Sequence, residues 1–175
     1  VEKKTSPTIV KIRLNKLSTL SLLTLGFIFS CSKPSFFMNY KDFNGQWPVY
    51  EKVLFTLDEG TENPVNLMIY IRNNKHYPYS NLFLIAKLKT GDSLLLCDTL
   101  EYAMADAQGQ WLGKGFLEVK ESKLSWRENY QLPAVENINV QLEHALRSYN
   151  SEQGIDTLEG IVGVGFAVEE IQEDE

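Results

Sequence analysis

The sequence predicts an all-β fold, a single antiparallel β-sandwich of the jelly-roll or immunoglobulin-like kind. Apolar and polar residues alternate over several short segments, which is the period expected of a half-buried strand. Turn residues separate these segments at short spacing, a pattern typical of sandwiches and barrels. A basic and then apolar N-terminal segment that ends at a cysteine sets residues 1–30 apart from that fold.

Residues 1–30 have the pattern of a lipoprotein signal peptide, and Cys31 is the predicted lipid attachment site. Five basic residues within residues 1–16 precede an apolar run over residues 17–29. A membrane-spanning helix needs roughly 20 residues, so this shorter run fits the core of a signal peptide. Ser30 is small enough to admit a peptidase, and the Cys31 thiol can carry a thioether-linked diacylglycerol. The alternative is an ordinary secretory signal with an incidental cysteine.

The acyl groups on Cys31 are the only non-protein groups that we expect, and no cofactor is predicted. A diacylglycerol and an N-acyl chain together supply more than one chain, and two or more chains anchor a protein durably. The predicted organisation is a signal peptide over 1–30, a lipidated cysteine and tether over 31–36, a β-sandwich over 37–171 and an acidic tail over 172–175.

The predicted mature chain is strongly acidic. The first 30 residues hold five of the 17 basic and one of the 23 acidic residues, which leaves 12 basic and 22 acidic residues in the remainder. Nucleic-acid binding needs basic patches that replace counterions, so no nucleic-acid partner is expected. Anionic lipid would repel the chain too, so the acyl chains must hold it at the membrane.

The predicted strands follow one another along the chain. The clearest is the segment in which Val65, Leu67, Ile69 and Ile71 occupy every second position. Pairs rich in Asn, Asp and Gly lie between the runs and indicate turns. The predicted strands cover residues 53–57, 65–71, 82–88, 93–102, 113–119, 137–142 and 161–171.

Two segments are less regular. Residues 142–149 have apolar residues at helical spacing, so we expect the preceding strand to run into a short helix. Residues 109–115 contain three glycines, which allow a positive φ or a close backbone approach. A hairpin turn with a bulge is favoured there over a phosphate cradle, because no helix follows to supply an N-terminal dipole.

The residue types that carry chemistry do not form a known catalytic pattern. Cys97 lies in an apolar run, so we expect a buried small hydrophobe. His76 lies in a turn and is expected to be solvated, whereas His144 ends a strand, and neither has zinc-ligand spacing. An acid–base pair and a loop calcium site are the alternatives for the carboxylates, but solvated surface charge is the commoner role, so no catalytic residue and no metal site are predicted. The carboxylates considered are Asp42, Asp58, Glu59, Asp92, Asp98, Glu101 and Asp106.

Aromatic residues gather near the tether and in loops. Tyr77, Tyr79 and Trp111 lie in predicted loops, and Trp47 lies in a cluster near the tether. Aromatic side chains are the usual anchors of protein interfaces, so core packing or contact with a partner is the favoured role. The alternative is a sugar-stacking platform made by Trp47, Tyr79 and Trp111.

Five segments resemble the GldH-type gliding-motility lipoproteins, and with the signal peptide they cover most of the chain in the right order. They are IYIRN at 69–73, YPYSNLFL at 77–84, DTLEY at 98–102, GQWLGKG at 109–115 and LEGIVGVG at 158–165. The resemblance implies an accessory component of the envelope machinery for gliding, which is functionally tied to type IX protein secretion. The family supplies no catalytic residues. For bacteria that do not glide, the resemblance implies a role in the secretion apparatus itself.

The sequence as a whole therefore predicts a non-catalytic envelope lipoprotein, anchored by lipid to the outer membrane and facing the periplasm. Its expected partners are other envelope proteins of the gliding and secretion assembly. A carbohydrate-binding envelope lipoprotein is the alternative. The residues predicted to contact a partner are Arg72, Tyr77, Pro78, Tyr79, Asn81 and Trp111.

Overall fold

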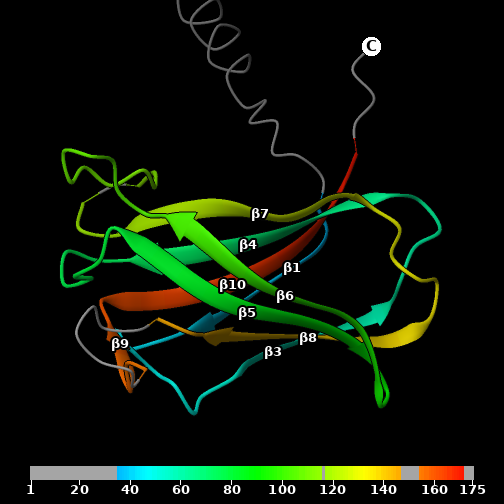
Figure 1. Ribbon diagram of the computed structural model, residues 1–175. Coiled ribbons are helices and arrows are strands. Elements are labelled where there is room, and N and C mark those ends of the chain that lie inside the picture. The colour runs from blue at the N-terminus through cyan, green and yellow to red at the C-terminus, as the bar shows by residue number, and fades with distance from the viewer. Residues whose placement is uncertain (1–34, 116, 147–153, 172–175) are drawn as a thin grey trace, which may run out of the picture. The chain divides into compact units, whose positions relative to one another are not determined.

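The computed structural model describes residues 35–115, 117–146 and 154–171, all of them in strands, turns and loops (Figure 1). The predicted signal peptide, Cys31, most of the tether and the acidic tail lie outside these residues. In the described part, no helix is long and apolar enough to cross a membrane. The strands are β1 Ser35–Asp42, β2 Gln46–Pro48, β3 Val53–Glu59, β4 Val65–Asn73, β5 Asn81–Thr90, β6 Ser93–Ala103, β7 Lys120–Tyr130, β8 Glu136–His144, β9 Thr157–Glu159 and β10 Ile161–Glu170.

Eight of these strands form two antiparallel four-stranded sheets. One sheet has the order β1-β10-β4-β7 and the other β3-β8-β5-β6, while β2 and β9 form a separate ribbon. The pairs nest around the β5–β6 hairpin, since β4 pairs with β7, β3 with β8 and β1 with β10. This nesting is the eight-stranded jelly roll. The predicted antiparallel β-sandwich is therefore confirmed, and it is of the jelly-roll kind.

The core lies between the two sheets and is built by the alternation seen in the sequence. Val65, Leu67, Ile69 and Ile71 on β4 are all at most 1 % exposed. Phe166 of β10 lies at the centre, with its ring about 6 Å from the rings of three other aromatic residues. Full burial of such a side chain stabilises the fold by about 1.5–3 kcal/mol. The three rings around Phe166 belong to Phe37, Phe55 and Trp126.

The prediction of a strand over residues 113–119 is wrong. Those of them that the structure describes lie in a loop, and a bridge between Lys114 and Glu121 pairs this loop with β7. The real strand is β7, immediately after it, which the sequence prediction missed. Ser122, Leu124 and Trp126 are buried at every second position of β7, but charged residues surround them and weaken the apolar signal. Of the three glycines in residues 109–115, Gly109 lies in a turn between Ala105 and Trp111, which form a bridge, and has φ +79°.

Two smaller predictions are also corrected. Cys97 is exposed rather than buried, because the inward-facing residues of β6 include Leu96 and Leu100, which pair with buried positions of β5. Cys97 lies one position out of phase and faces solvent. The short helix expected after residue 142 does not begin in the described residues, where β8 continues to His144. Residues 147–149 of that prediction lie outside the described residues.

The sandwich has two distinct ends. The chain enters β1 at Ser35, beside the end of β10 and near the start of β4. At the other end, on the left in Figure 1, strands β1 and β4 end, and the described residues of the loops over 74–80 and 104–119 lie beside them. Strand β4 spans this length with nine residues, which corresponds to about 26 Å at 3.3 Å per residue. The loop end is therefore well separated from the point where the chain enters.

Candidate functional site

Three of the aromatic residues that the sequence singled out form one cluster at the loop end. The ring of Tyr77 lies 5.7 Å from that of Tyr79 and 6.0 Å from that of Trp111. The Tyr77 hydroxyl donates a hydrogen bond to the Asn81 carbonyl oxygen, at 2.7 Å. Burial, and then the neighbouring Tyr79, raise the pKa of Tyr77 well above its usual range. We call Tyr77, Tyr79 and Trp111 the ring cluster.

Gly160 holds the turn that carries the ring cluster. Its φ is +79°, and a Cβ at this position would lie 2.1 Å from the Tyr77 backbone nitrogen. The Asn74 N–H donates to the Gly160 carbonyl, and the Gly160 N–H donates to the Gly45 carbonyl, both at 2.8 Å. Only glycine combines this dihedral angle with so close an approach, so the β9–β10 corner fixes the position of Tyr77.

The six predicted contact residues do not form one surface. Tyr77 is only 2 % exposed, so its side chain packs inside the fold and offers a partner little surface. Pro78 is exposed, whereas Tyr79, Asn81 and Trp111 are half-buried around it. The Asn81 side-chain amide donates to Glu101 at 3.1 Å. Arg72 lies apart from these residues, on the outer face of the β1-β10-β4-β7 sheet.

Arg72 packs over an aromatic ring on that outer face. Its guanidinium carbon lies 3.9 Å from the centre of the Tyr40 ring, a cation–π arrangement. The Nε of Arg72 lies 2.6 Å from Oε2 of Glu121, and the Tyr40 hydroxyl donates to the same oxygen at 3.1 Å. Burial, and then the Glu121 carboxylate, raise the pKa of Tyr40 to about 12.

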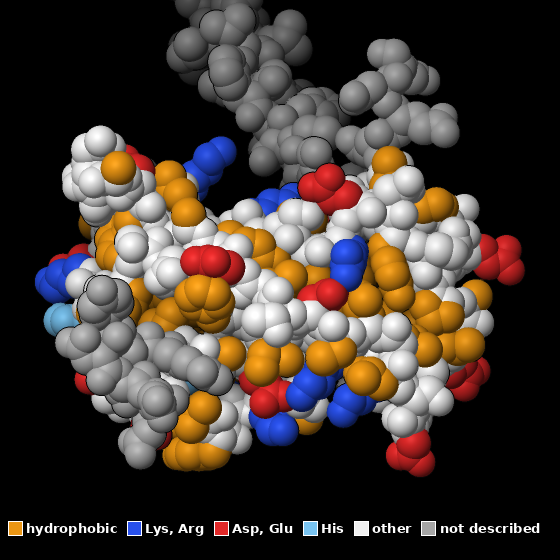
Figure 2. Space-filling model, viewed as in Figure 1, with side chains coloured by type: hydrophobic (Ala, Val, Ile, Leu, Met, Phe, Trp, Pro, Cys, Tyr) orange, Lys and Arg blue, Asp and Glu red, His pale blue; other side chains and the backbone are white. Residues whose placement is uncertain are grey.

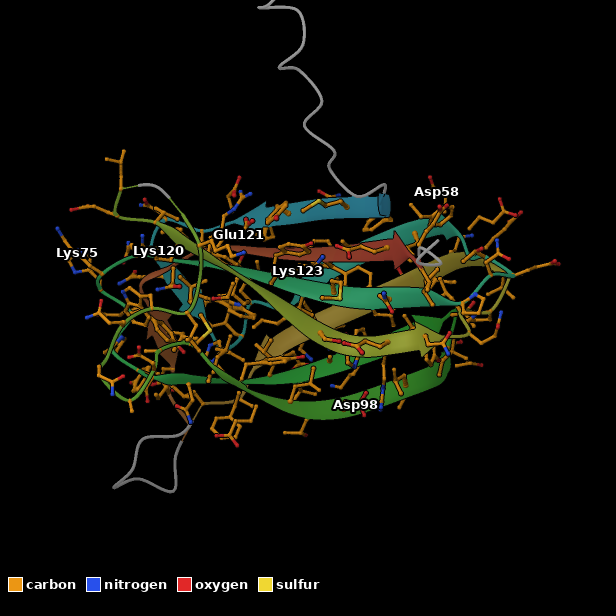
Figure 3. All side chains as sticks on the ribbon, turned by 90° about the horizontal axis from the view of Figure 1, so that it is seen from above. Asp58, Lys75, Asp98, Lys120, Glu121 and Lys123 are labelled. Carbon is orange, nitrogen blue, oxygen red and sulfur yellow. The ribbon has the colours of Figure 1, made fainter. Side chains whose placement is uncertain are left out.

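A second set of charged and aromatic residues continues this arrangement along the same face. The Tyr70 hydroxyl donates to one oxygen of Glu169 and Lys123 Nζ pairs with the other, both at 2.7 Å. The Tyr70 ring lies 6.1 Å from the ring of Tyr40, which joins the two sets. Figure 3 shows Glu121 and Lys123 following one another along β7. We call these residues the outer-face network: Tyr40, Tyr70, Arg72, Glu121, Lys123 and Glu169.

Small residues on β10 make room for the outer-face network. Gly163 and Gly165 lie on the outer face of β10, between β1 and β4. A Cβ at Gly165 would lie 2.5 Å from the Tyr40 ring, and one at Gly163 would lie 3.3 Å from the Arg72 side chain. The tyrosine ring therefore lies flat across the strand. Sequence reasoning found Arg72 but missed the rest of the network.

The carbohydrate-stacking platform is not formed. Trp47 is fully buried, its Nε1 donates to the Glu51 carbonyl at 2.7 Å, and its ring packs against Phe43 and His144. It therefore cannot share an exposed platform with Tyr79 and Trp111. This result contradicts the geometric requirement of the carbohydrate-binding alternative.

The other candidate chemical residues differ in exposure and in hydrogen bonding. His76 is exposed as expected and His144 is buried, and burial lowers the pKa of His144. Asp98 accepts hydrogen bonds from Trp126 Nε1 at 2.8 Å and Arg127 at 2.6 Å. Among the described residues, no group of three His, Cys, Asp or Glu side chains is placed to hold a metal ion. On the face shown in Figure 2, basic and acidic side chains are interspersed.

Comparisons with known proteins agree on one family. A family model described as GldH lipoprotein matches residues 35–168. The protein named Gliding motility lipoprotein GldH homolog, from Christiangramia forsetii, is 40 % identical over 149 residues, which are 85 % of this chain and 91 % of that protein. Gliding motility lipoprotein GldH from Flavobacterium johnsoniae is 36 % identical over 156 residues, 89 % of this chain and 97 % of that protein. No solved structure matches.

Proposed function

We propose that this chain, which belongs to the GldH lipoprotein family, serves gliding motility as a non-catalytic, protein-binding component of the cell envelope. The names of the two relatives support the motility role. Its partners are other envelope proteins of the gliding assembly and of the type IX secretion apparatus linked to it. The residues that contact the partner are Pro78, Tyr79, Asn81 and Trp111 at the loop end. Arg72, on the outer face of the sheet, also contributes.

The membrane anchor in this proposal is lipid on Cys31. A diacylglycerol and an N-acyl chain hold the protein at the outer membrane, where it faces the periplasm. Replacement of Cys31 by alanine is expected to leave the sandwich folded and to move the protein from the membrane fraction to the soluble fraction. Fractionation of cells followed by immunoblotting checks this. Equal retention of the variant at the membrane would contradict the anchor.

The separation between the end where the chain enters the sandwich and the loop end is the structural observation that supports this proposal most. Ser35 lies four positions after Cys31, so the end of the sandwich at which the chain enters stays close to an anchor at Cys31. The ring cluster lies at the other end, about 26 Å further along β4 by its rise per residue. A domain held in this way presents its loop end away from the membrane, where a partner can reach it. Aromatic side chains positioned on a rigid scaffold are suited to that contact.

Affinity purification of the lipidated protein from its own envelope tests the proposed partners. We expect components of the gliding or type IX secretion assembly to co-purify with the wild type and to be reduced with Tyr79→Ala. Tyr50 is a matched control, because it is a tyrosine outside the ring cluster that is 81 % exposed. Tyr50→Ala should retain the same proteins. Recovery of envelope proteins of sugar uptake alone would contradict the proposal.

A further inference from the structure

At one position of the free edge of β7, the backbone groups form hydrogen bonds with the loop that precedes the strand. We call such a position a closure of the edge. Strand β7 ends its sheet, since the order is β1-β10-β4-β7. On the side away from β4, Glu121 forms a bridge with Lys114, with backbone hydrogen bonds of 2.7 and 2.8 Å in the two directions. The N–H and C=O of Glu121 therefore both point out from the sheet edge.

The same edge is closed again four residues further on. Backbone groups alternate in direction along a strand, so the N–H and C=O of Lys123 and Ser125 point to the same side as those of Glu121. The Ser125 carbonyl accepts a hydrogen bond from the Tyr102 hydroxyl at 2.7 Å. Between these two closures, the outward backbone groups of Lys123 have no hydrogen-bond partner among the described residues. An unpaired edge of this kind is a template for another strand.

A hollow of about 540 Å³ lies beside this position. Its wall includes Leu112 and Lys114 from the loop and Ser122, Lys123 and Leu124 from β7. Ser122 is only 6 % exposed, and its Oγ has no hydrogen-bond partner in the described part of the chain. A buried hydroxyl without a partner costs free energy, which a ligand that bonds to it would recover.

The wall of the hollow combines positive charge with apolar surface. Lys114 is exposed, and no described carboxylate lies within ion-pair distance of its ammonium group. Leu112 is 55 % exposed. Together with the backbone of Lys123, these residues offer a cation, an apolar contact and a hydrogen-bonding donor–acceptor pair.

We propose that this stretch of the β7 edge binds a short extended peptide segment of a partner protein, and that the segment carries a carboxylate. The segment adds to the edge as a strand: its N–H donates to the Lys123 carbonyl and its C=O accepts from the Lys123 N–H. The closures at Glu121 and Ser125 restrict the paired segment to about three residues, because alternate residues share a side of the strand. The peptide carboxylate pairs with Lys114, and an apolar side chain packs on Leu112. This site deepens the protein-binding role proposed above and rests on it.

Titration of the full-length lipidated protein in detergent micelles with blocked tripeptides tests the site. The probe is N-acetyl-Val-Asp-Val-amide, followed by amide chemical shifts in a two-dimensional ¹⁵N–¹H spectrum. We expect saturable shifts at Ser122 and Lys123. The Asn-centred tripeptide should bind roughly fivefold more weakly, the loss expected for one exposed ion pair. A tripeptide N-methylated at its central residue, which lacks the pairing donor, should not shift these amides.

Two variants locate the charge contact. Lys114→Ala should abolish the preference for Asp over Asn while leaving the Lys123 amide sensitive to the peptide. Lys89→Ala, a lysine on the other sheet, should leave the preference unchanged. Equal binding of the N-methylated peptide, the same shifts with acetate alone, or no shift at Lys123 would each overturn the proposal. Because the titration needs no motility partner, a negative result here is distinguishable from failure of the purification experiment above.

Discussion

Replacing Gly160 with alanine should destabilise the fold far more than the same change at other glycines with a positive φ. The added Cβ would lie 2.1 Å from the Tyr77 nitrogen, 2.4 Å from its Cα and 2.7 Å from the His76 carbonyl carbon. All three are backbone atoms, so no side chain can rotate away to relieve the contact. The turn over residues 74–77 must then move, and the ring cluster must move with it.

The expected loss has two parts. Alanine at φ +79° is in the left-handed region, which costs about 1–2 kcal/mol. Forcing an extra carbon into packed structure costs about 1–3 kcal/mol, whereas the reduced freedom of the unfolded chain returns only about 0.4–1 kcal/mol. The net loss is about 2–4 kcal/mol, a large fraction of the roughly 5–15 kcal/mol that stabilises a typical domain.

Urea unfolding followed by tryptophan fluorescence measures this loss. With a slope of about 1–3 kcal/mol per molar urea, the midpoint should fall by about 1–2 M with the slope unchanged. Gly109→Ala is the matched control, since Gly109 also has φ +79° but no atom lies within 4 Å of its added Cβ. Gly109→Ala should lose only the dihedral part, about 1 kcal/mol. Equal losses in the two variants would show that Gly160 does not hold the turn by close approach.

The remaining predictions concern the outer-face network and the buried tyrosines. Gly165→Ala should destabilise the fold by about 1 kcal/mol, because the three atoms nearest the added Cβ all belong to the Tyr40 ring, which can rotate away with loss of its contacts. A Tyr40→Ala background should remove most of that loss, and an undiminished loss would contradict this explanation. Burial and neighbouring carboxylates raise the pKa of Tyr40 and of Tyr102 to about 12, while an unfolded tyrosine titrates near 10. The folded state therefore keeps protons that the unfolded state releases, so stability is full below pH 10 and falls from pH 10 to 12. Urea midpoints that stay constant from pH 10 to 12 would refute the predicted pH dependence of stability.

The sequence predicted the parts of the fold that depend on local alternation. Strand β4 was recognisable because Val65, Leu67, Ile69 and Ile71 are apolar and every second residue faces the core. The same rule could have found β7, but its inward residues are Ser122, Leu124 and Trp126, and the serine interrupts the pattern. The phase of β6 was ambiguous, because a run of apolar residues before Cys97 fits either face. Alternation identifies a strand more readily than it identifies which face is buried.

The outer-face network could not be predicted, because it depends on pairing between distant segments. Tyr40 and Glu121 share a hydrogen bond although they are 81 positions apart. Their contact requires the register of β1 with β10, of β10 with β4 and of β4 with β7. A shift of one residue in any of these pairings would send one partner to the opposite face. No local pattern in the sequence carries that information.

The segment LEGIVGVG explains why the two candidate surfaces depend on one short stretch of the chain. Gly160 admits the backbone of Tyr77, Gly163 borders the Arg72 side chain, and Gly165 lies beneath the Tyr40 ring. The first glycine thus positions the ring cluster, and the other two position the outer-face network. This segment contributed to the family resemblance, and its glycines have a physical role here: Gly160 and Gly165 permit approaches that a side chain would block, and a Cβ at Gly163 would press on the Arg72 side chain. A partner that contacts both surfaces would therefore bind residues whose positions are set by the β9–β10 corner and the first residues of β10, so a change in this segment would affect both surfaces together.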